Sequence, residues 1–250
     1  MPLFGTLDIA PRIAEAPRLT TLQPEPWDTP GAQILQVMYE IAEGRVLDLL
    51  PPALHATIPP VITFTVARYP NAPVGPFTLA QVRLGCRAGV RPRGFLLRAY
   101  CDSADARAAL AANWGYACRE GEIALHHYHD RIEATVRAGG ADVLRMALVD
   151  PEPISGGDIQ YTANMNLARL PESDGGEPVL VQVDPEYAFR RAERGRARLD
   201  AFERGAWAAD AVEPVYAVIA SYAVCDTGFP RIRYVVDPAK PALAGTRAVG

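Results

Sequence analysis

The sequence predicts one β-rich α+β domain, and three observations lead to that fold class. Short segments that alternate in polarity, or that gather β-branched and aromatic residues, recur along most of the chain. Helical patterns are few, and neither an internal repeat nor a low-complexity linker divides the chain. Its 250 residues, 49% of them hydrophobic, are enough to bury one sizeable core. Residues 1–250 are therefore expected to form a single domain, built as a barrel or a sandwich.

The N-terminal half begins with an arm and continues with strands. Residues 1–30, rich in proline and threonine, predict an extended N-terminal arm. Residues 34–39 predict a strand, and the short helix that follows it ends at Pro51 and Pro52. The β-branched and aromatic content of the next segments predicts three further strands, over 60–69, 76–89 and 93–101.

A helix precedes the most reactive stretch of the chain. Asp102 or Ser103 is a good N-cap for an alanine-rich helix over 104–114, which ends near Gly115. The stretch NWGYACREGEIALHHYHD, residues 113–130, overlaps its end and carries a cysteine beside an arginine and three of the four histidines. These residue types could serve as metal ligands, as a thiol nucleophile or as ordinary strand side chains.

The C-terminal half predicts more strands and one helix. The clearest hairpin covers 132–149, with two alternating strands and a pair of glycines at the turn. A charged stretch, roughly 185–204, predicts a helix, and 239–250 predicts a flexible tail. The remaining predicted strands or strand-like segments are 161–171, 179–184, 214–229 and 231–238.

Composition excludes several classes of function. The net charge of −4 gives no general reason to expect a nucleic-acid partner. The N-terminus has no basic segment followed by an apolar run of signal length, and no stretch approaches about eighteen uninterrupted apolar residues. We therefore expect a cytoplasmic protein without membrane contact. No glycine-rich phosphate-binding motif is present, so no nucleotide and no other cofactor is expected.

Cysteine and lysine usage restricts the chemistry further. Lys240 is the only lysine, so an amine nucleophile is available at just one side chain. It lies between two prolines in the predicted tail, a setting that indicates surface or disorder rather than a catalytic pocket. The cysteines lack the CxxC spacing of zinc sites, which favours free thiols at Cys86, Cys101, Cys118 and Cys225.

Several segments together resemble the acetoacetate decarboxylase family. The helix ending at Trp114 leads into an aromatic-Gly-Tyr tag at 114–116, where the family carries a tag of the form Tyr-Pro-Lys-Lys. The resemblance extends over most of the chain from about residue 30 to 238. The other segments keep the family's order and spacing, and they are LLPPAL at 49–54, GPFT at 75–78, NLARLPESDGGEP at 166–178 and the run at 199–238.

This resemblance implies a fold and a chemistry. The fold is a closed, cone-like β-barrel of the acetoacetate decarboxylase-like type with flanking helices, a cavity for one small molecule, and assembly into homo-oligomers. In the family, the first lysine of the tag forms a Schiff base with a ketone. The charge of the second lysine lowers the pKa of the first, so that a free amine exists near neutral pH.

The chain departs from the family at these catalytic positions. Tyr116 aligns with the tag tyrosine, Cys118 with the Schiff-base lysine and Arg119 with its activating neighbour. The family's two acidic residues fall at Leu79 and at about Phe64. Because a thiol cannot form an iminium, the alignment predicts an enzyme without a Schiff base.

Two readings of Cys118 remain open. With Arg119 beside it, its pKa would fall, and a histidine acting as base would make the thiol a nucleophile. Alternatively, Cys118 is a small buried residue that replaced a lysine when the old chemistry was lost. Arg119 is the arginine we expect to hold an anionic group of the substrate. It is one of five arginines in or beside predicted strands, with Arg98, Arg131, Arg145 and Arg169.

The histidines also have more than one reading. On a strand, His127 and His129 would share one face and His126 the other. A His-x-His pair can supply two metal ligands, but no third ligand at a characteristic spacing is visible, so no metal is predicted. General acid–base chemistry or substrate hydrogen bonding by at least one histidine is the alternative, and solvated or packing roles account for the rest.

The sequence therefore predicts a small-molecule enzyme that acts on an oxo acid or a related metabolite. A lyase, isomerase or cyclase reaction needs only proton transfer and stabilisation of an enolate. Tyr116 and either His127 or His129 would move protons, Arg119 would hold a substrate anion, and Cys118 would line the pocket. Two alternatives stay open, a non-catalytic ligand-binding pseudoenzyme and a metal- or thiol-dependent hydrolase.

Overall fold

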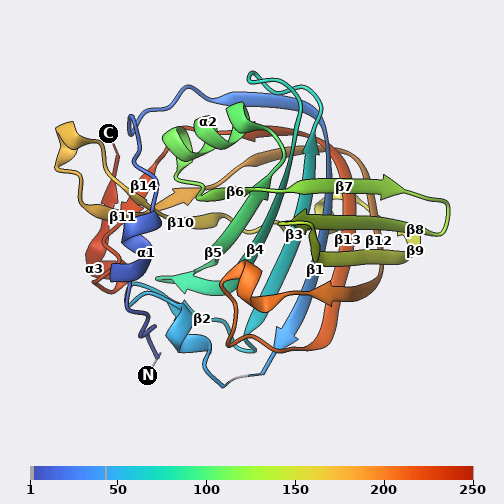
Figure 1. The fold of residues 1–250 in the computed structure, drawn as a ribbon, viewed down its shortest axis with the longest axis horizontal. Helices are drawn as coiled ribbons and strands as arrows, with labels where there is room; N and C mark the ends of the chain where they lie inside the picture. The colour runs from blue at the N-terminus through green and yellow to red at the C-terminus, as the bar shows by residue number, and fades with distance from the viewer. Residues whose placement is uncertain (1–2, 43, 250) are drawn as a thin grey trace.

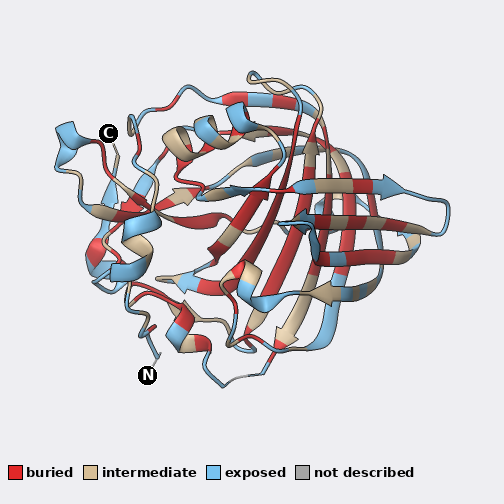
Figure 2. Ribbon diagram, viewed as in Figure 1, coloured by how far each residue is buried: buried red, intermediate tan, exposed pale blue. Residues whose placement is uncertain are grey.

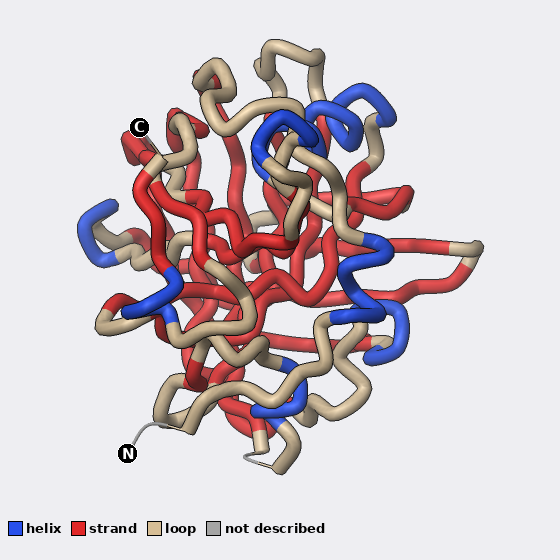
Figure 3. Tube along the Cα trace, turned by 90° about the vertical axis from the view of Figure 1, so that its left-hand side faces the viewer, coloured by secondary structure: helices blue, strands red, loops and turns tan. Residues whose placement is uncertain are grey.

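A computed structural model describes residues 3–42 and 44–249, and it is strand-rich α+β as the sequence predicts. Figure 1 shows long curved strands through the centre and short helices at the periphery, and Figure 3 gives the same picture from the side. None of the helices in these ranges is long and apolar enough to span a membrane. The helices are α1 (Ala10–Glu15), α2 (Ala104–Trp114) and α3 (Ala242–Gly245).

The strands of the first half of the chain follow the predicted segments closely. The short helix predicted after the first strand is a 3-10 turn, η1 (Val46–Leu49). The strands are β1 (Trp27–Ile41), β2 (His55–Ala56), β3 (Val61–Tyr69), β4 (Phe77–Ala88), β5 (Arg91–Cys101), β6 (Cys118–Glu120) and β7 (Glu122–His127).

The second half adds the predicted hairpin and several longer strands. Gly139 and Gly140 form the hairpin turn, both with positive φ. Three 3-10 turns connect the later strands, η2 (Gly156–Asp158), η3 (Glu172–Asp174) and η4 (Arg204–Trp207). The strands are β8 (Arg131–Ala138), β9 (Ala141–Pro153), β10 (Asn164–Arg169), β11 (Pro178–Val183), β12 (Glu186–Phe202), β13 (Pro214–Phe229), β14 (Tyr234–Val236) and β15 (Thr246–Ala248).

All of these strands belong to one sheet. Its order is β15-β14-β11-β10-β5-β4-β3-β1-β13-β12-β9-β8-β7, with β2 beside β4 and β6 beside β5. The sheet curls, so that β7 packs over β3, β4 and β5. In the described ranges β7 and β15 stand at opposite ends of the path without a ladder between them. The strand-rich α+β class is thus confirmed, whereas the closure of a cone-like barrel is not.

The apolar core lies on both faces of the central strands. Side chains alternate along a strand, so on β4 Val82 and Leu84 enter one apolar cluster while Phe77 and Leu79 enter the other. Figure 2 shows these central strands as almost continuously buried. The two clusters also take up the three tryptophans, Trp27, Trp114 and Trp207, as packing residues.

The predicted helix at 185–204 is wrong, because this segment is strand β12. Its alanines, arginines and glutamates favour a helix locally. The segment instead pairs with β9 along one edge and with β13 along the other, and its exposed and partly buried residues largely alternate. Gly195 permits this pairing, since a Cβ there would lie 2.5 Å from the Val149 carbonyl oxygen. Long-range strand pairing therefore overrides the local propensity.

Both predicted irregular ends contain regular structure. The extended arm carries helix α1 and the start of β1, and the Gly5 N–H donates to the Leu54 carbonyl at 2.8 Å. The predicted tail forms α3 and then β15, which pairs with β14. The Ala242 N–H also donates to the Ala53 carbonyl at 3.1 Å. Backbone hydrogen bonds thus hold the described parts of both ends to the body of the domain.

Helix α2 begins and ends as predicted. The Ser103 hydroxyl accepts a hydrogen bond from the Ala106 N–H at 3.3 Å, which makes it the N-cap. Gly115 ends the helix in the left-handed conformation with φ of 69°, and its N–H donates to the Ala111 carbonyl. This turn directs the chain inward, so that the next side chain, Tyr116, is buried.

Candidate active site

An internal cavity opens where polar side chains of the central strands meet. Its free volume is about 20 Å³, room for about one water molecule. None of its lining residues in the described ranges is a lysine, histidine, aspartate or glutamate. Its polar lining residues come from β1, β3, β4, β10, β12 and two loops, and they are Gln36, Thr65, Tyr69, Gln81, Arg83, Tyr116, Tyr161, Asn164 and Tyr187.

Arg83 is the most unusual of these residues, because its charge is buried without a carboxylate. Its exposed fraction is 4%, and no aspartate or glutamate in the described ranges forms an ion pair with it. Its hydrogen bonds go to neutral acceptors, and Nε has none. Nη1 donates to the Thr162 carbonyl at 2.9 Å and to Asn164 Oδ1 at 2.7 Å, and Nη2 donates to Gln36 Oε1 at 3.1 Å and Thr65 Oγ1 at 3.2 Å.

An isolated buried cation of this kind attracts an anion. Burial lowers the pKa of the Arg83 guanidinium, but an arginine stays charged in proteins. The four neutral acceptors compensate only part of the lost hydration, since a buried charge is fully compensated only when it is paired. The cavity therefore offers a fixed positive charge to a ligand carboxylate or to a developing oxyanion.

Asn164 connects Arg83 to Tyr116. Its Oδ1 accepts from Arg83, while its Nδ2 donates to Tyr116 Oη at 2.9 Å and to Gln81 Oε1 at 2.8 Å. Because Tyr116 Oη accepts this bond, the phenol keeps its own proton to donate elsewhere. The Asn164 side-chain amide thus binds the Arg83 guanidinium through its oxygen and the Tyr116 hydroxyl through its nitrogen.

The tyrosines of the cavity act as proton donors rather than bases. Burial raises the pKa of Tyr116 and Tyr187 above the ordinary value, and it raises the pKa of Tyr69 and Tyr161 well above it. All four phenols are therefore protonated at neutral pH. Tyr161 and Tyr187 are each partly exposed as whole residues and meet edge to face, with ring centroids 4.9 Å apart, while the Tyr161 hydroxyl is buried and has no hydrogen-bond partner in the described ranges.

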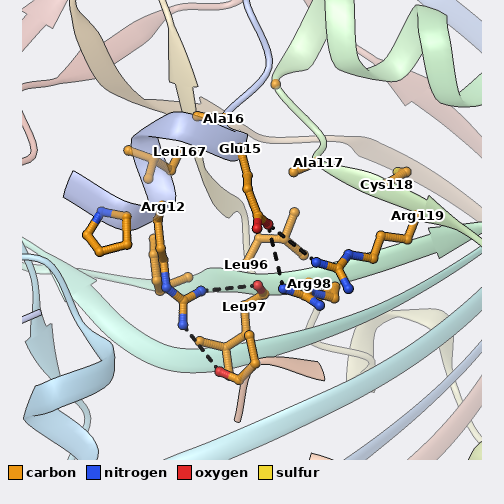
Figure 4. Close-up of a pocket in the computed structure, with 14 residues that line it drawn as sticks. Arg12, Glu15, Ala16, Leu96, Leu97, Arg98, Ala117, Cys118, Arg119 and Leu167 are labelled. Carbon is orange, nitrogen blue, oxygen red and sulfur yellow. Dashed lines mark hydrogen bonds and ion pairs between the residues drawn. The ribbon is translucent and has the colours of Figure 1, made fainter. Parts of the chain in front are cut away.

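Cys118 and Arg119 do not line this cavity but a separate cleft beside helix α1. Figure 4 shows the Arg119 side chain extending toward Glu15 and away from Cys118. Arg119 Nη2 lies 3.4 Å from Glu15 Oε2. Burial raises the pKa of the Cys118 thiol far above its ordinary value, and Arg107 is the cation that opposes this rise. The arrangement therefore does not support activation of the thiol by Arg119, which is one of the two readings of Cys118.

The histidines lie away from both spaces. His127 ends β7, where its Nε2 is 3.2 Å from the Oε2 of the buried Glu193 and its ring contacts Tyr222. His129 follows in the turn and is exposed, so the two residues do not share a strand face. His126 is also exposed and its ring contacts Tyr128. The structure does not bring any of them to Tyr116.

No group of three or more histidine, cysteine, aspartate or glutamate side chains in the described ranges is arranged to hold a metal ion. Lys240 lies on the surface, where its Nζ is 2.9 Å from Asp237 Oδ2 and about two thirds of its side chain, 66%, is exposed. The described structure thus supplies no amine to the internal cavity.

A sequence profile of acetoacetate decarboxylase matches residues 13–238 of this chain. The chain belongs to the acetoacetate decarboxylase family. No curated protein matches it.

Solved structures show the same fold at low identity. The acetoacetate decarboxylase of Legionella pneumophila is 19% identical, with 89% of this chain and 92% of that chain covered and a TM-score of 0.75. The enduracididine biosynthesis enzyme MppR complexed with pyruvate is 15% identical, with 91% of each chain covered and a TM-score of 0.65. An acetoacetate decarboxylase-like enzyme from Sphingomonas wittichii RW1 is 17% identical, covers 85% of this chain and 94% of its own, and has a TM-score of 0.60.

Within this acetoacetate decarboxylase family member, the predicted site residues separate. Tyr116 lines the internal cavity, Cys118 and Arg119 line the cleft, and His127 lies near Glu193. Arg83 was not among the predicted residues. Its signal in the sequence is the single charged residue within a strand of uncharged, mostly apolar or small residues, FTLAQVRLGC, where a charge needs a partner or a function.

The raised pKa of Cys118 predicts slow alkylation. Because the folded-state pKa lies above the ordinary thiol value, the thiolate fraction at neutral pH is lower than in a free peptide. At a pH of about 7.5, we expect iodoacetamide to modify Cys118 in the folded protein more slowly than in the urea-unfolded chain, by roughly tenfold or more. Peptide mass mapping over a pH series measures it. A folded-state rate equal to the unfolded one would show a reactive thiolate.

Proposed function

We propose that this protein is a small-molecule enzyme that binds an oxo acid in the internal cavity and works without a Schiff base. The observation that carries the proposal is Arg83, a buried guanidinium with neutral partners only and a free Nε–H. Such a group suits the anionic oxygen of an oxo acid or of the enolate derived from it. Arg83 takes the role that the sequence suggested for Arg119.

A lyase reaction fits the cavity better than an isomerase or a cyclase reaction. Loss of carbon dioxide from a β-oxo acid produces an enolate, and this step requires a positive charge and a proton donor but no base. Arg83 would stabilise the developing oxyanion, and the Tyr116 hydroxyl would donate a hydrogen bond to it. Isomerisation and cyclisation begin with removal of a proton, and no lining residue in the described ranges is a base at neutral pH.

The type of ligand finds support in a structural neighbour. The MppR structures contain pyruvate in one case and the condensation product of pyruvate and imidazole 4-carboxaldehyde in another. For this protein we propose only the same class of ligand, an oxo acid. Because the free volume of the cavity is about that of one water molecule, binding of a molecule the size of pyruvate requires side chains of the cavity wall, such as Tyr161 and Tyr187, to move.

Two assays test this function. In calorimetry, pyruvate should bind to the protein, and borohydride added to the same mixture should leave no covalent adduct in the intact mass. The released product from oxaloacetate or acetoacetate, followed by NMR against a protein-free sample, reports turnover. An adduct trapped on the chain would contradict the absence of a Schiff base, and the lack of any oxo-acid binding would contradict the site.

A ligand-binding protein without turnover is the second candidate. The observation that favours it is the absence of a carboxylate, imidazole or amine among the lining residues in the described ranges. It predicts pyruvate binding of the same strength with no product from any of the oxo acids. The metal- or thiol-dependent hydrolase has no such support, since Cys118 is protonated and outside the cavity.

We also propose that copies of the chain associate through the first part of β13. Within the part of the chain that the structure describes, residues 214–219 pair with β1 on one side only, because β12 pairs with β13 from Ala220 onward. The same stretch exposes Val215, Tyr216 and Val218, an unusual run of apolar side chains on a strand with a free edge. Light scattering of Tyr216→Asp and of the unchanged protein tests this association. If copies associate through this edge, the variant should form a smaller particle than the unchanged protein. A cytoplasmic location completes the proposal.

A further inference from the structure

The cleft beside helix α1 lies at a split in the sheet. Strand β5 pairs in parallel with β10 at Gly94 and Phe95, and with β6 from Ala99 to Cys101. Between these two ladders, no strand among the described residues pairs with this edge of β5 at 96–98. A cleft of about 350 Å³ opens there, and helix α1 lies across it, as Figure 4 shows. This volume is in the range of small-molecule sites.

Arg12 of α1 has a structural role in the cleft. Its Nη1 donates to the Leu97 carbonyl at 3.3 Å and its Nη2 to the Ala208 carbonyl at 3.2 Å. The first of these carbonyls lies on the unpaired part of β5, so Arg12 satisfies an acceptor that a neighbouring strand would otherwise take. Arg12 therefore holds α1 in place, and its guanidinium is not available to bind a ligand carboxylate.

Two other arginines share a single carboxylate. Glu15 Oε2 lies 3.8 Å from Arg98 Nη2 and 3.4 Å from Arg119 Nη2, distances longer than a well-formed charged hydrogen bond. The Arg98 side chain is only 16% exposed, whereas Glu15 is largely exposed. Burial lowers the pKa of Arg98, and the nearby charge of Arg119 lowers it further. The cleft thus carries an excess of positive charge that Glu15 only partly offsets.

We propose that this cleft is a second ligand site, which binds the carboxylate of a small metabolite between Arg98 and Arg119 in competition with Glu15. Arg98 Nη1 also donates to the Ala206 carbonyl at 3.4 Å, but the partner that the two guanidinium groups share is itself a carboxylate, so the geometry already suits that group. The walls of the cleft are apolar at Leu96, Leu97 and Leu167, which suits the carbon skeleton of such a ligand. This proposal does not rest on the internal cavity.

Removal of the competing carboxylate is the sharpest test. We expect calorimetry with malonate as probe, at low salt, to show binding to the full-length protein. Glu15→Gln should strengthen this binding by about fivefold, since an exposed carboxylate of this kind holds the arginines weakly. Arg119→Gln should weaken malonate binding by roughly tenfold or more, because one charged partner is lost. Glu177→Gln, at an exposed glutamate paired with Arg247 elsewhere, is the matched control and should change nothing.

Two further measurements separate this site from the internal cavity. Arg83→Gln should leave malonate binding in the cleft unchanged, so loss of the cavity site and loss of the cleft site give different results. Arg119 is half exposed and replaceable without loss of the fold, and Arg119→Lys should restore part of the affinity. No malonate binding to Glu15→Gln, or equal binding to the unchanged protein and Arg119→Gln, would overturn the proposal.

Discussion

Arg83→Gln should weaken the binding of pyruvate by about 10- to 100-fold, because a charge-assisted hydrogen bond to a carboxylate is lost. Glutamine retains an amide that can donate to Asn164 or Gln36, which limits the disturbance to the surrounding acceptors. The folded structure should therefore persist. Calorimetric titration gives the affinity, and a thermal unfolding curve confirms that the variant is folded.

A second arginine provides the control for this result. Arg93 is also buried, with an exposed fraction of 8%, but its side chain does not line the cavity. Arg93→Gln should therefore leave the affinity for pyruvate unchanged. If Arg83→Gln binds pyruvate as the unchanged protein does, then Arg83 does not hold the ligand. If both variants lose binding equally, the effect is a general consequence of removing a buried arginine.

Gly115→Ala should destabilise the protein by about 2–4 kcal/mol, since backbone strain and overpacking add. Gly115 has φ of 69°, a conformation that L-residues adopt at a cost. A Cβ at this position would also lie 2.7 Å from the Cβ of Ala168, a distance that real Cβ atoms do not show. Chemical denaturation of the variant and of the unchanged protein measures the difference in the free energy of unfolding.

Gly139 is the control position that separates backbone strain from overpacking. It has a similar positive φ of 58°, but nothing lies within 4 Å of the position that a Cβ would take. Gly139→Ala should thus lose only about 1 kcal/mol from strain. The double change Gly115→Ala with Ala168→Gly should recover part of the lost stability. Equal losses at Gly115 and Gly139 would show that the contact with Ala168 is unimportant.

The parts of the fold that local patterns encode were predictable. Ser103 and Gly115 mark both ends of α2, and the glycines at 139–140 mark the hairpin turn, because each acts through its own neighbours in the sequence. Strand β12 was not predictable in this way. Its composition favours a helix, and only its pairing with β9 and β13, which lie far away in the chain, makes it a strand.

In the candidate site, too, local sequence indicates some residues, whereas others depend on long-range strand pairing. Tyr116 was predictable because the tag follows directly from the end of α2. Arg83 meets Asn164 and Tyr116 only through pairing among β4, β5 and β10 and the packing around them, so the sequence shows the arginine without its partners. The reading in which Arg119 activates Cys118 finds no support in the structure for a different reason. Neighbouring residues of strand β6 point in different directions, and Glu15, from a segment predicted as an irregular arm, attracts the guanidinium.

Asn164 has a consequence for how the internal site can change. Both atoms of its amide are engaged, with the oxygen on Arg83 and the nitrogen on Tyr116 and Gln81. A replacement of Arg83, Tyr116 or Gln81 removes one partner from this amide, and a replacement of Asn164 removes the amide from all three, so the effects of paired replacements should be strongly non-additive. The four residues therefore act as one hydrogen-bonded unit. A member of the family that loses Asn164 is expected to have altered Arg83 and Tyr116 as well.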